Sequence, residues 1–238
     1  MPTTTIQENL QRIQERIVSA AARAGRKAAE ITLIGVSKTH PAEAIREAYA
    51  AGLRHFGENR VQEWEGKQCG IQGLDATWHL IGHLQSNKAA KAAKLFHSID
   101  SVDDFALAQR LERGRLESKS PEKMRVLIEV HIAQEAAKSG AGIEDLPALA
   151  QKIGALPMLE LAGLMCVPPF VENSEETRPY FRQLRTLRDG LEKALGRRLP
   201  VLSMGMSHDF EVAIEEGATE VRVGTAIFGA RGTLKAAR

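Results

Sequence analysis

The sequence predicts a (β/α)8 barrel (a TIM barrel) with an extra helix in front of it. Strand-like apolar runs alternate with amphipathic helical patterns along the chain, and eight such units fit the sequence. Several strand-like runs end in Gly, Ser, Asn or Asp and pass directly into a helix, as βα loops do. The length of 238 residues is close to the ~250 residues of a typical barrel of this kind.

The first 30 residues are predicted to form a helix, and residues 31–231 are predicted to form the barrel, so that 1–238 is one domain. Thr5 followed three residues later by Glu8 matches a capping box at the start of the helix. Apolar residues then recur at helical spacing and form one stripe: Ile6, Leu10, Ile13 and Ile17.

The barrel strands are expected at eight apolar runs, namely 31–38, 53–59, 77–83, 95–100, 125–132, 159–167, 200–207 and 220–229. Helical patterns lie between them, among them 41–52, 101–114 and 174–195. Strands separated by helices favour parallel pairing with right-handed crossovers. A doubly wound open sheet is the alternative that the same alternation allows.

The composition is that of an ordinary globular protein, with 43% hydrophobic and 26% charged residues. A net charge of +2 argues against a dedicated nucleic-acid binder, and no apolar run is long enough to predict a membrane span. Two cysteines, Cys69 and Cys166, cannot build a disulfide framework or a four-ligand zinc site. The N-terminus lacks the apolar region of a signal peptide, so we expect a cytoplasmic protein.

In a barrel of this type the active site lies at the carboxyl ends of the strands. That rule selects the following candidates: Lys38, Glu58, Asn59, Gly82, His83, Asp100, His131, Met165, the turn from Ser203 to Ser207, Gly224 and Thr225. Lys38 closes the first strand, where desolvation favours a neutral amine that can attack a carbonyl. The alternative is a surface lysine at the start of a βα loop.

The ends of the last two strands are typical of a phosphate site. Ser203 and Ser207 flank Gly205 just before a helix, and Ser207 is predicted to be its N-cap. Unpaired N–H groups at a helix N-terminus attract anions. Gly224 and Thr225 supply a second glycine and hydroxyl after the eighth strand. The alternative is that the glycines only make tight turns.

Arg222 is the unusual residue of the eighth strand. Alternation along the strand places it on the face opposite Val221 and Val223, so it points into the barrel if the valines pack on helices. A cation buried there needs a partner, either a ligand nitrogen or a carboxylate such as Glu129, and an ion pair is the simpler interpretation.

Two further features predict no site of their own. His79 and His83 share a strand face, but no carboxylate completes a ligand set at useful spacing, so we expect no metal. Basic stripes on two helical patterns are interpreted as solvated helix faces rather than nucleic-acid contacts.

Long ordered motifs from about residue 5 to about residue 231 resemble the pyridoxal-phosphate homeostasis protein family. The motifs are GVSKTHP, HFGENRVQE, WHLIGHLQSNK, GLMCVPP and LSMGMSHDFEVAIEEGATEVRVGTAIFG. That family looks like the barrel domain of alanine racemase without its second, β-rich domain. The resemblance implies a fold-type III protein that binds pyridoxal 5'-phosphate (PLP).

The resemblance also implies residue roles. Lys38 matches the Schiff-base lysine, and Arg222 matches the residue that faces the pyridine nitrogen. Ser203, Ser207, Gly224 and Thr225 match positions around the phosphate, and Asn59, His83 and Met165 match positions that line the cofactor pocket. The sequence departs from the family at Cys166 and Val167, where Thr and Ile are common, and at His131 and Ala133, where Asn and Ser are common.

Three functions from different classes fit these residues. The first is a PLP carrier without catalytic turnover, the second a PLP-dependent amino-acid racemase, and the third a barrel enzyme that acts on a phosphorylated metabolite through Lys38. A racemase needs acid and base on opposite faces of its substrate, and both tyrosines, Tyr49 and Tyr180, fall in helical patterns away from strand ends. An arginine beside the pyridine nitrogen also weakens the ring as an electron sink.

The sequence therefore favours a carrier that supplies PLP to PLP-dependent apo-enzymes, with neither nucleic acid nor membrane as partner. The family suggests a monomer or weak dimer. If Lys38 does not hold the cofactor, Lys138 and Lys88 are the next candidates.

Overall fold

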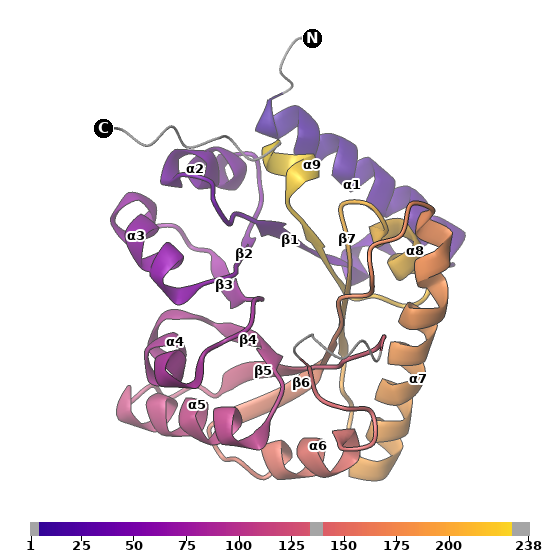
Figure 1. The fold of residues 1–238 in the computed structure, drawn as a ribbon. Coiled ribbons are helices and arrows are strands. Elements are labelled where there is room, and N and C mark those ends of the chain that lie inside the picture. The colour runs from indigo at the N-terminus through magenta and orange to yellow at the C-terminus, as the bar shows by residue number, and fades with distance from the viewer. Residues whose placement is uncertain (1–4, 134–139, 230–238) are drawn as a thin grey trace.

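The computed structural model describes residues 5–133 and 140–229 of the chain. Within this part, eight strands pair in chain order and in parallel, and the last strand pairs with the first, so the sheet closes into a barrel. Helices alternate with the strands and surround them (Figure 1). The predicted (β/α)8 barrel is confirmed, and the open-sheet alternative is wrong.

The strands are β1 (Thr32–Val36), β2 (His55–Glu58), β3 (Thr77–Leu80), β4 (Ser98–Val102), β5 (Met124–Glu129), β6 (Leu159–Met165), β7 (Val201–Met206) and β8 (Glu220–Val223). The helices are α1 (Ile6–Arg23), α2 (Ala42–Ala50), α3 (Val61–Ile71), α4 (Ala89–Leu95), α5 (Phe105–Glu117), α6 (Leu146–Gly154), α7 (Arg178–Leu195), α8 (Phe210–Glu215) and α9 (Thr225–Phe228). Three short 3-10 helices are η1 (Ala28–Glu30), η2 (Ser86–Lys88) and η3 (Ser174–Thr177).

The N-terminal helix α1 packs along the outside of α8 and α9 (Figure 1). The predicted capping box is present, because Oγ1 of Thr5 accepts the Glu8 N–H at 3.2 Å and Glu8 accepts the Thr5 N–H at 2.9 Å. The helix ends at Arg23, earlier than the predicted residue 30. Gly25 follows with φ of +65°, the left-handed conformation that commonly stops a helix.

The predicted boundaries around β4 and β8 were also wrong. β4 runs to Val102, and α5 begins only at Phe105, because Asp104 caps it by accepting the Leu107 N–H at 2.6 Å. β8 ends at Val223, and after Gly224 the residues Thr225–Phe228 form α9 rather than a continued strand. Apolar residues at 221–228 hid this change, since a short apolar run fits either element.

Polar side chains from four strands meet inside the barrel near the N-terminal ends of the strands: His79, Asp100, Arg125 and Glu220, called the Arg125 cluster below. Nη1 of Arg125 donates to Oε1 of Glu220 at 2.5 Å. Because β5 and β8 are not neighbours in the sheet, this contact crosses the interior. Asp100, expected at a strand end, lies instead in the middle of β4, with Oδ2 at 3.1 Å from Nδ1 of His79.

The Arg125 cluster has donor types that also suit a metal ion, namely one imidazole and two carboxylates. The guanidinium of Arg125 already supplies a cation there, because its Nη2 lies 3.5 Å from Oδ1 of Asp100. Although burial alone raises the pKa of Asp100, His79 and Arg125 hold that pKa well below its usual range. We therefore assign the cluster to the structural end of the barrel.

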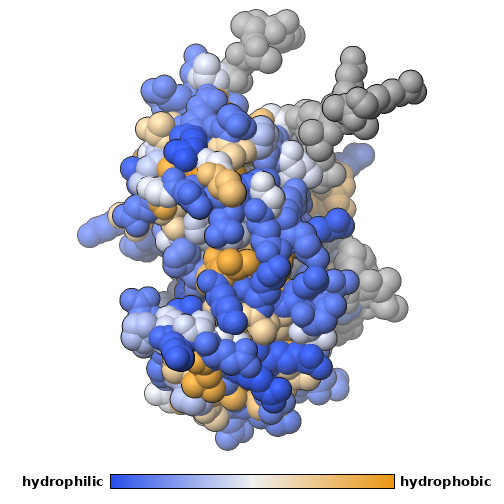
Figure 2. Space-filling model, turned by 90° about the vertical axis from the view of Figure 1, so that its left-hand side faces the viewer, coloured by the Kyte–Doolittle hydropathy of each residue, from blue (hydrophilic) through white to orange (hydrophobic). Residues whose placement is uncertain are grey.

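The apolar core lies between the barrel and the surrounding helices. The outer face over α2 to α5 is largely hydrophilic, with apolar side chains in small separate spots, because these helices turn their apolar faces inward (Figure 2). None of the helices in the described ranges is long and apolar enough to cross a membrane.

Candidate functional site

The site residues predicted from the sequence lie at or near the carboxyl ends of strands, which surround one mouth of the barrel. Lys38 lies in the turn after β1, Asn59 directly follows β2, His83 lies in the loop after β3, and Met165 ends β6. Ser203 and Arg222 lie within β7 and β8, and Ser207, Gly224 and Thr225 follow those two strands.

Arg222 is buried, with 4% of its surface exposed, and it points into the barrel as predicted. Its Nη1 donates to Oγ of Ser203 at 2.8 Å, and its Nη2 donates to the carbonyl oxygen of Cys166 at 2.8 Å. Neither acceptor is a carboxylate, so these contacts are not the simple ion pair that the sequence favoured. They fix the guanidinium through neutral oxygens, and the buried carboxylate of Asp209 also interacts electrostatically with it.

The end of β6 supplies packing and a carbonyl rather than a reactive group. Met165 is fully buried and packs with Leu127 and Ala162 inside the barrel. Burial raises the pKa of the Cys166 thiol to about 12, so the thiol stays protonated. The contribution of Cys166 to the site is therefore its backbone oxygen.

The loops after β7 and β8 contact each other. Oγ of Ser207 accepts the backbone N–H of Gly224 at 3.3 Å. The prediction that Ser207 is the N-cap of α8 was wrong, because Asp209 holds that position and accepts the Met206 N–H at 2.6 Å. Thr225 is the first residue of α9. These loops bring a hydroxyl and main-chain N–H groups together, which suits an anionic oxygen.

Gly205 allows β7 to end close against α8. Its φ is +91°, and a Cβ atom there would lie 2.6 Å from Cβ of Ala213 and 2.9 Å from Cα of Phe210. Only glycine fits such a position without displacing the helix. The close approach places Ser207, two residues later, beside the end of β8.

Lys38 is half-buried in the turn of residues 37–40 that joins β1 to α2. Thr39 in this turn has a φ of 66°, a conformation that non-glycine residues seldom adopt. Of the two further candidate lysines, Lys138 lies outside the described residues, and Lys88 lines a pocket beside the mouth.

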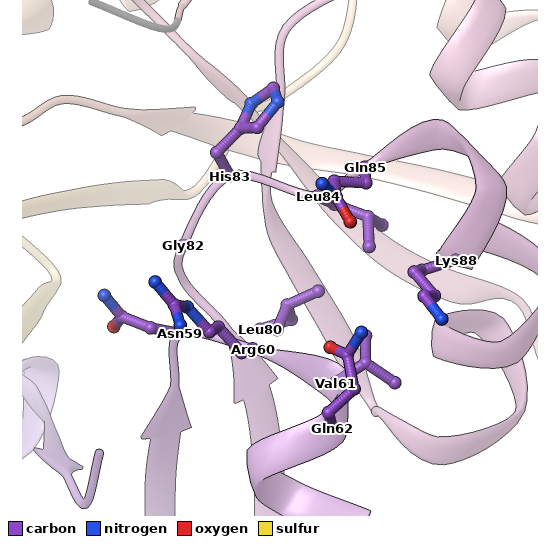
Figure 3. A pocket seen from close by; sticks show the side chains of 10 residues that line it. All are labelled: Asn59, Arg60, Val61, Gln62, Leu80, Gly82, His83, Leu84, Gln85 and Lys88. Carbon is purple, nitrogen blue, oxygen red and sulfur yellow. The ribbon is translucent and has the colours of Figure 1, made fainter. Parts of the chain in front are cut away.

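That pocket has a volume of about 660 Å³ and opens between the loops after β2 and β3 (Figure 3). Asn59 and Gly82 lie on one side of it, and Arg60 and Lys88 bring two cations to its wall. His83 lies at its edge with its ring directed outward, and its Nδ1 is 3.4 Å from Oδ2 of Asp103. The imidazole is thus a rim group.

Two groups that hold the site residues in place escaped the sequence analysis. Lys67 of α3 donates to the carbonyl oxygen of Ser37 and to Oε1 of Glu58, both at 2.8 Å. A lysine within a helical pattern looks like a solvated residue, so no signal marked it. The Cys166 carbonyl escaped for a different reason, since main-chain oxygens carry no residue-type signal.

The sequence and fold of the chain match those of known proteins. The family model described as the N-terminal domain of alanine racemase matches residues 5–232. A pyridoxal phosphate homeostasis protein of Pseudomonas aeruginosa is 48% identical over 228 residues, covering 96% of each chain. The protein of the same name from Aquifex aeolicus is 47% identical over 224 residues, covering 94% of this chain and 97% of the relative.

Among solved structures, PipY of Synechococcus elongatus PCC7942 with PLP bound superposes with a TM-score of 0.80 at 45% identity. The match covers 91% of this chain and 100% of PipY. The fold is therefore that of the alanine racemase barrel domain. Within that class, the chain belongs to the pyridoxal phosphate homeostasis protein family, and the resemblance read from its motifs is confirmed.

Proposed function

We propose that this protein binds PLP covalently through Lys38 and holds it for PLP-dependent apo-enzymes, without robust catalytic turnover of its own. The names of its relatives and the PLP-bound form of PipY support this proposal. The cofactor would contribute an aldehyde that reacts with an amine and a ring that accepts electrons.

The residues at the mouth fit the aldehyde and the phosphate of such a cofactor. The amine of Lys38 suits the aldehyde. The Ser207 hydroxyl and the main-chain N–H groups at the start of α9 suit the phosphate, since they meet where β7 and β8 end. Gly224 adds a close approach of backbone, because a Cβ atom there would lie 3.3 Å from the Val36 carbonyl oxygen.

The arrangement of Arg222 is the observation that carries the proposal of binding without turnover. Its guanidinium is held by the neutral oxygens of Ser203 and Cys166, so it can also donate to a ring nitrogen. Because a guanidinium does not give up a proton, it leaves that nitrogen unprotonated. This weakens electron withdrawal by the ring, whereas a carboxylate at the same place would strengthen it.

The remaining residues are proposed to have supporting roles or to line the pocket. We assign Ser203 to support of Arg222, since its hydroxyl accepts from the guanidinium. Asn59 and Met165 are proposed to line the pocket, and His83 is proposed to lie at its rim. Thr225 is proposed to contribute through its position at the start of α9.

The described tyrosines do not supply the second base of a racemase. Tyr49 lies on the outer helix α2, where the Arg54 guanidinium stacks 4.1 Å from its ring. Tyr180 packs against the hydrophobic core from α7. A proton delivered to the face opposite Lys38 would have to come from another group.

The experiment begins with the absorbance spectrum of the purified protein with added PLP. Borohydride reduction followed by peptide mapping should find the cofactor on Lys38, and Lys88→Ala and Lys138→Ala serve as controls that keep it there. Incubation with L- and D-alanine should then produce no sustained change in chirality. A protein that stays colourless with PLP overturns the proposal of binding, and sustained racemisation overturns the proposal of a carrier.

A further inference from the structure

A buried polar cluster lies directly behind the turn that carries Lys38. It consists of Ser37, Glu58 and Lys67, and is called the Glu58 cluster here. Oγ of Ser37 donates to Oε1 of Glu58 at 2.6 Å, and Nζ of Lys67 donates to the same oxygen at 2.8 Å. The side chain of Glu58 is fully buried, and that of Lys67 is 11% exposed. Neither side chain belongs to the contacts of the proposed cofactor site.

The cluster holds Ser37 from several directions. The Ser37 N–H donates to the Gly57 carbonyl at 3.0 Å, and the Ser37 carbonyl accepts from Lys67 at 2.8 Å and from the His40 N–H at 3.0 Å. With the bond from its hydroxyl to Glu58, every polar group of Ser37 is engaged. The residue immediately before Lys38 is thus fixed to β2 and α3.

The other side of Lys38 is held as well. Thr39 adopts the left-handed conformation with φ of 66°, and its N–H donates to Oε1 of Glu63 on α3. Such a conformation costs free energy and persists only where surrounding contacts impose it. Lys38 therefore lies between two residues whose backbone is fixed by β2 and α3.

Stability alone does not explain an ion pair at this place. A buried pair of charges is often no more stable than an apolar pair of the same volume, because desolvation offsets the attraction. Here burial raises the pKa of Glu58 in spite of Lys67, and Oε2 of Glu58 has no hydrogen-bond partner among the described residues. An arrangement with this cost is better explained by what it positions.

We propose that Glu58 and Lys67 are positioning residues for Lys38: through Ser37 they hold the turn of residues 37–40 so that the Lys38 amine faces the mouth of the barrel. This inference rests on the proposed function for its meaning, since a lysine that captures an aldehyde needs a fixed direction of approach. The geometry of the turn itself does not depend on PLP.

The test compares Glu58→Gln, Lys67→Met and Lys67→Arg with the wild-type protein. The matched control is Lys91→Met, which breaks an exposed ion pair, with Nζ of Lys91 at 2.6 Å from Oε1 of Glu65, away from the turn. Because Lys67→Met leaves a buried carboxylate unpaired, the double variant Glu58→Gln/Lys67→Met is included as one in which neither charge remains.

Two readouts are recorded for each folded variant. The first is the rate at which PLP is captured covalently, and the second is hydrogen–deuterium exchange at the His40 N–H. We expect Lys67→Met and the double variant to slow capture and to speed exchange by about tenfold each, as loss of charge-assisted hydrogen bonds implies. Lys67→Arg, which keeps a donor, should retain most of the capture rate and most of the protection of the His40 N–H from exchange. Lys91→Met should match the wild type in both readouts.

Failure of this inference and failure of the proposed function give different results. If the wild type captures no PLP while hydrogen–deuterium exchange at the His40 N–H still rises in the variants, the proposed function is wrong. The inference that Glu58 and Lys67 hold the turn of residues 37–40 is then still supported. If capture is normal in the wild type and unchanged in the folded double variant, Glu58 and Lys67 do not position Lys38. A lower melting temperature with both readouts unchanged would likewise overturn the inference.

Discussion

The hydroxyl of Ser207 accepts the backbone N–H of Gly224 at 3.3 Å and thereby joins the loop after β7 to the loop after β8. These are the loops that supply a phosphate site in many barrels of this fold. In this chain the contact fixes a main-chain group of one loop against a side chain of the other. The contact therefore joins the two loops beyond the pairing of β7 with β8.

Ser207→Ala is expected to weaken PLP binding by about tenfold while leaving binding of pyridoxal, which has no phosphate, nearly unchanged. The substitution removes the acceptor of the Gly224 N–H and one donor to the phosphate in the proposed site. Equilibrium dialysis with both ligands measures the two affinities. Ser118→Ala is the control, because its hydroxyl donates to the Arg115 carbonyl and accepts the Ser120 N–H at the end of α5. Equal losses for both ligands would contradict a phosphate role.

Arg222→Glu is expected to change the absorbance spectrum of bound PLP, because a carboxylate shares a proton with the ring nitrogen and a guanidinium does not. Arg222→Gln keeps an N–H donor toward Ser203 or Cys166 and should change the spectrum less. Circular dichroism of both variants checks that the barrel is intact. A folded Arg222→Glu variant with the wild-type spectrum would reduce Arg222 to a structural role.

His55 should make the free energy of unfolding depend on pH. Burial, followed by the nearby His79 and Arg125, lowers the pKa of His55 to about 4. Since the unfolded chain binds a proton near the ordinary value of about 6.5 and the folded chain does not, stability falls as pH drops from about 6.5 to about 4.

His55→Gln should flatten that part of the pH profile. Urea unfolding at pH 7, 6 and 5 measures the slope, and His208→Gln, at an exposed histidine, is the control. The slope is the informative quantity, because the substitution also removes the contact of 3.1 Å between Nδ1 of His55 and Nε2 of His79 at every pH. An unaltered slope would show that the pKa of His55 in the folded chain is not lowered.

Gly205→Ala is expected to lower the free energy of unfolding by about 2 kcal/mol or more, through overpacking and an unfavourable φ. Its Cβ would meet Ala213 and Phe210 at less than 3.0 Å. Gly190→Ala is the matched control: within α7 nothing lies within 4 Å of the added atom, so it should stabilise by about 0.5–1 kcal/mol. Equal effects of the two substitutions would refute the argument from close approach.

Much of the architecture could be predicted because it follows from local patterns. Helical spacing from Ile6 to Ile17 and eight apolar runs determine the elements, and strands separated by helices leave few topologies. Element ends were less certain. Ser207 and Asp209 are both good N-cap residues two positions apart, and in the structure the helix begins after Asp209.

For the candidate site, too, some residues could be predicted from local patterns and others could not. Position at a strand end was enough to select Lys38 and Ser207 for the mouth of the barrel, and alternation along the eighth strand was enough to direct Arg222 into the interior. The partners of these residues depend on closure of the sheet and on main-chain atoms. The Cys166 carbonyl that accepts from Arg222 and the reach of Lys67 to Ser37 therefore had no counterpart in the sequence pattern.

The Arg125 cluster limits where the proposed cofactor can enter and leave the barrel. Since Arg125 and Glu220 join strands across the interior, the N-terminal half of the barrel is plugged by paired charges. PLP that enters at the opposite mouth would have to leave through the same opening. If the protein delivers PLP as proposed, an acceptor enzyme would have to dock over that opening, and loading and delivery of PLP would compete for it.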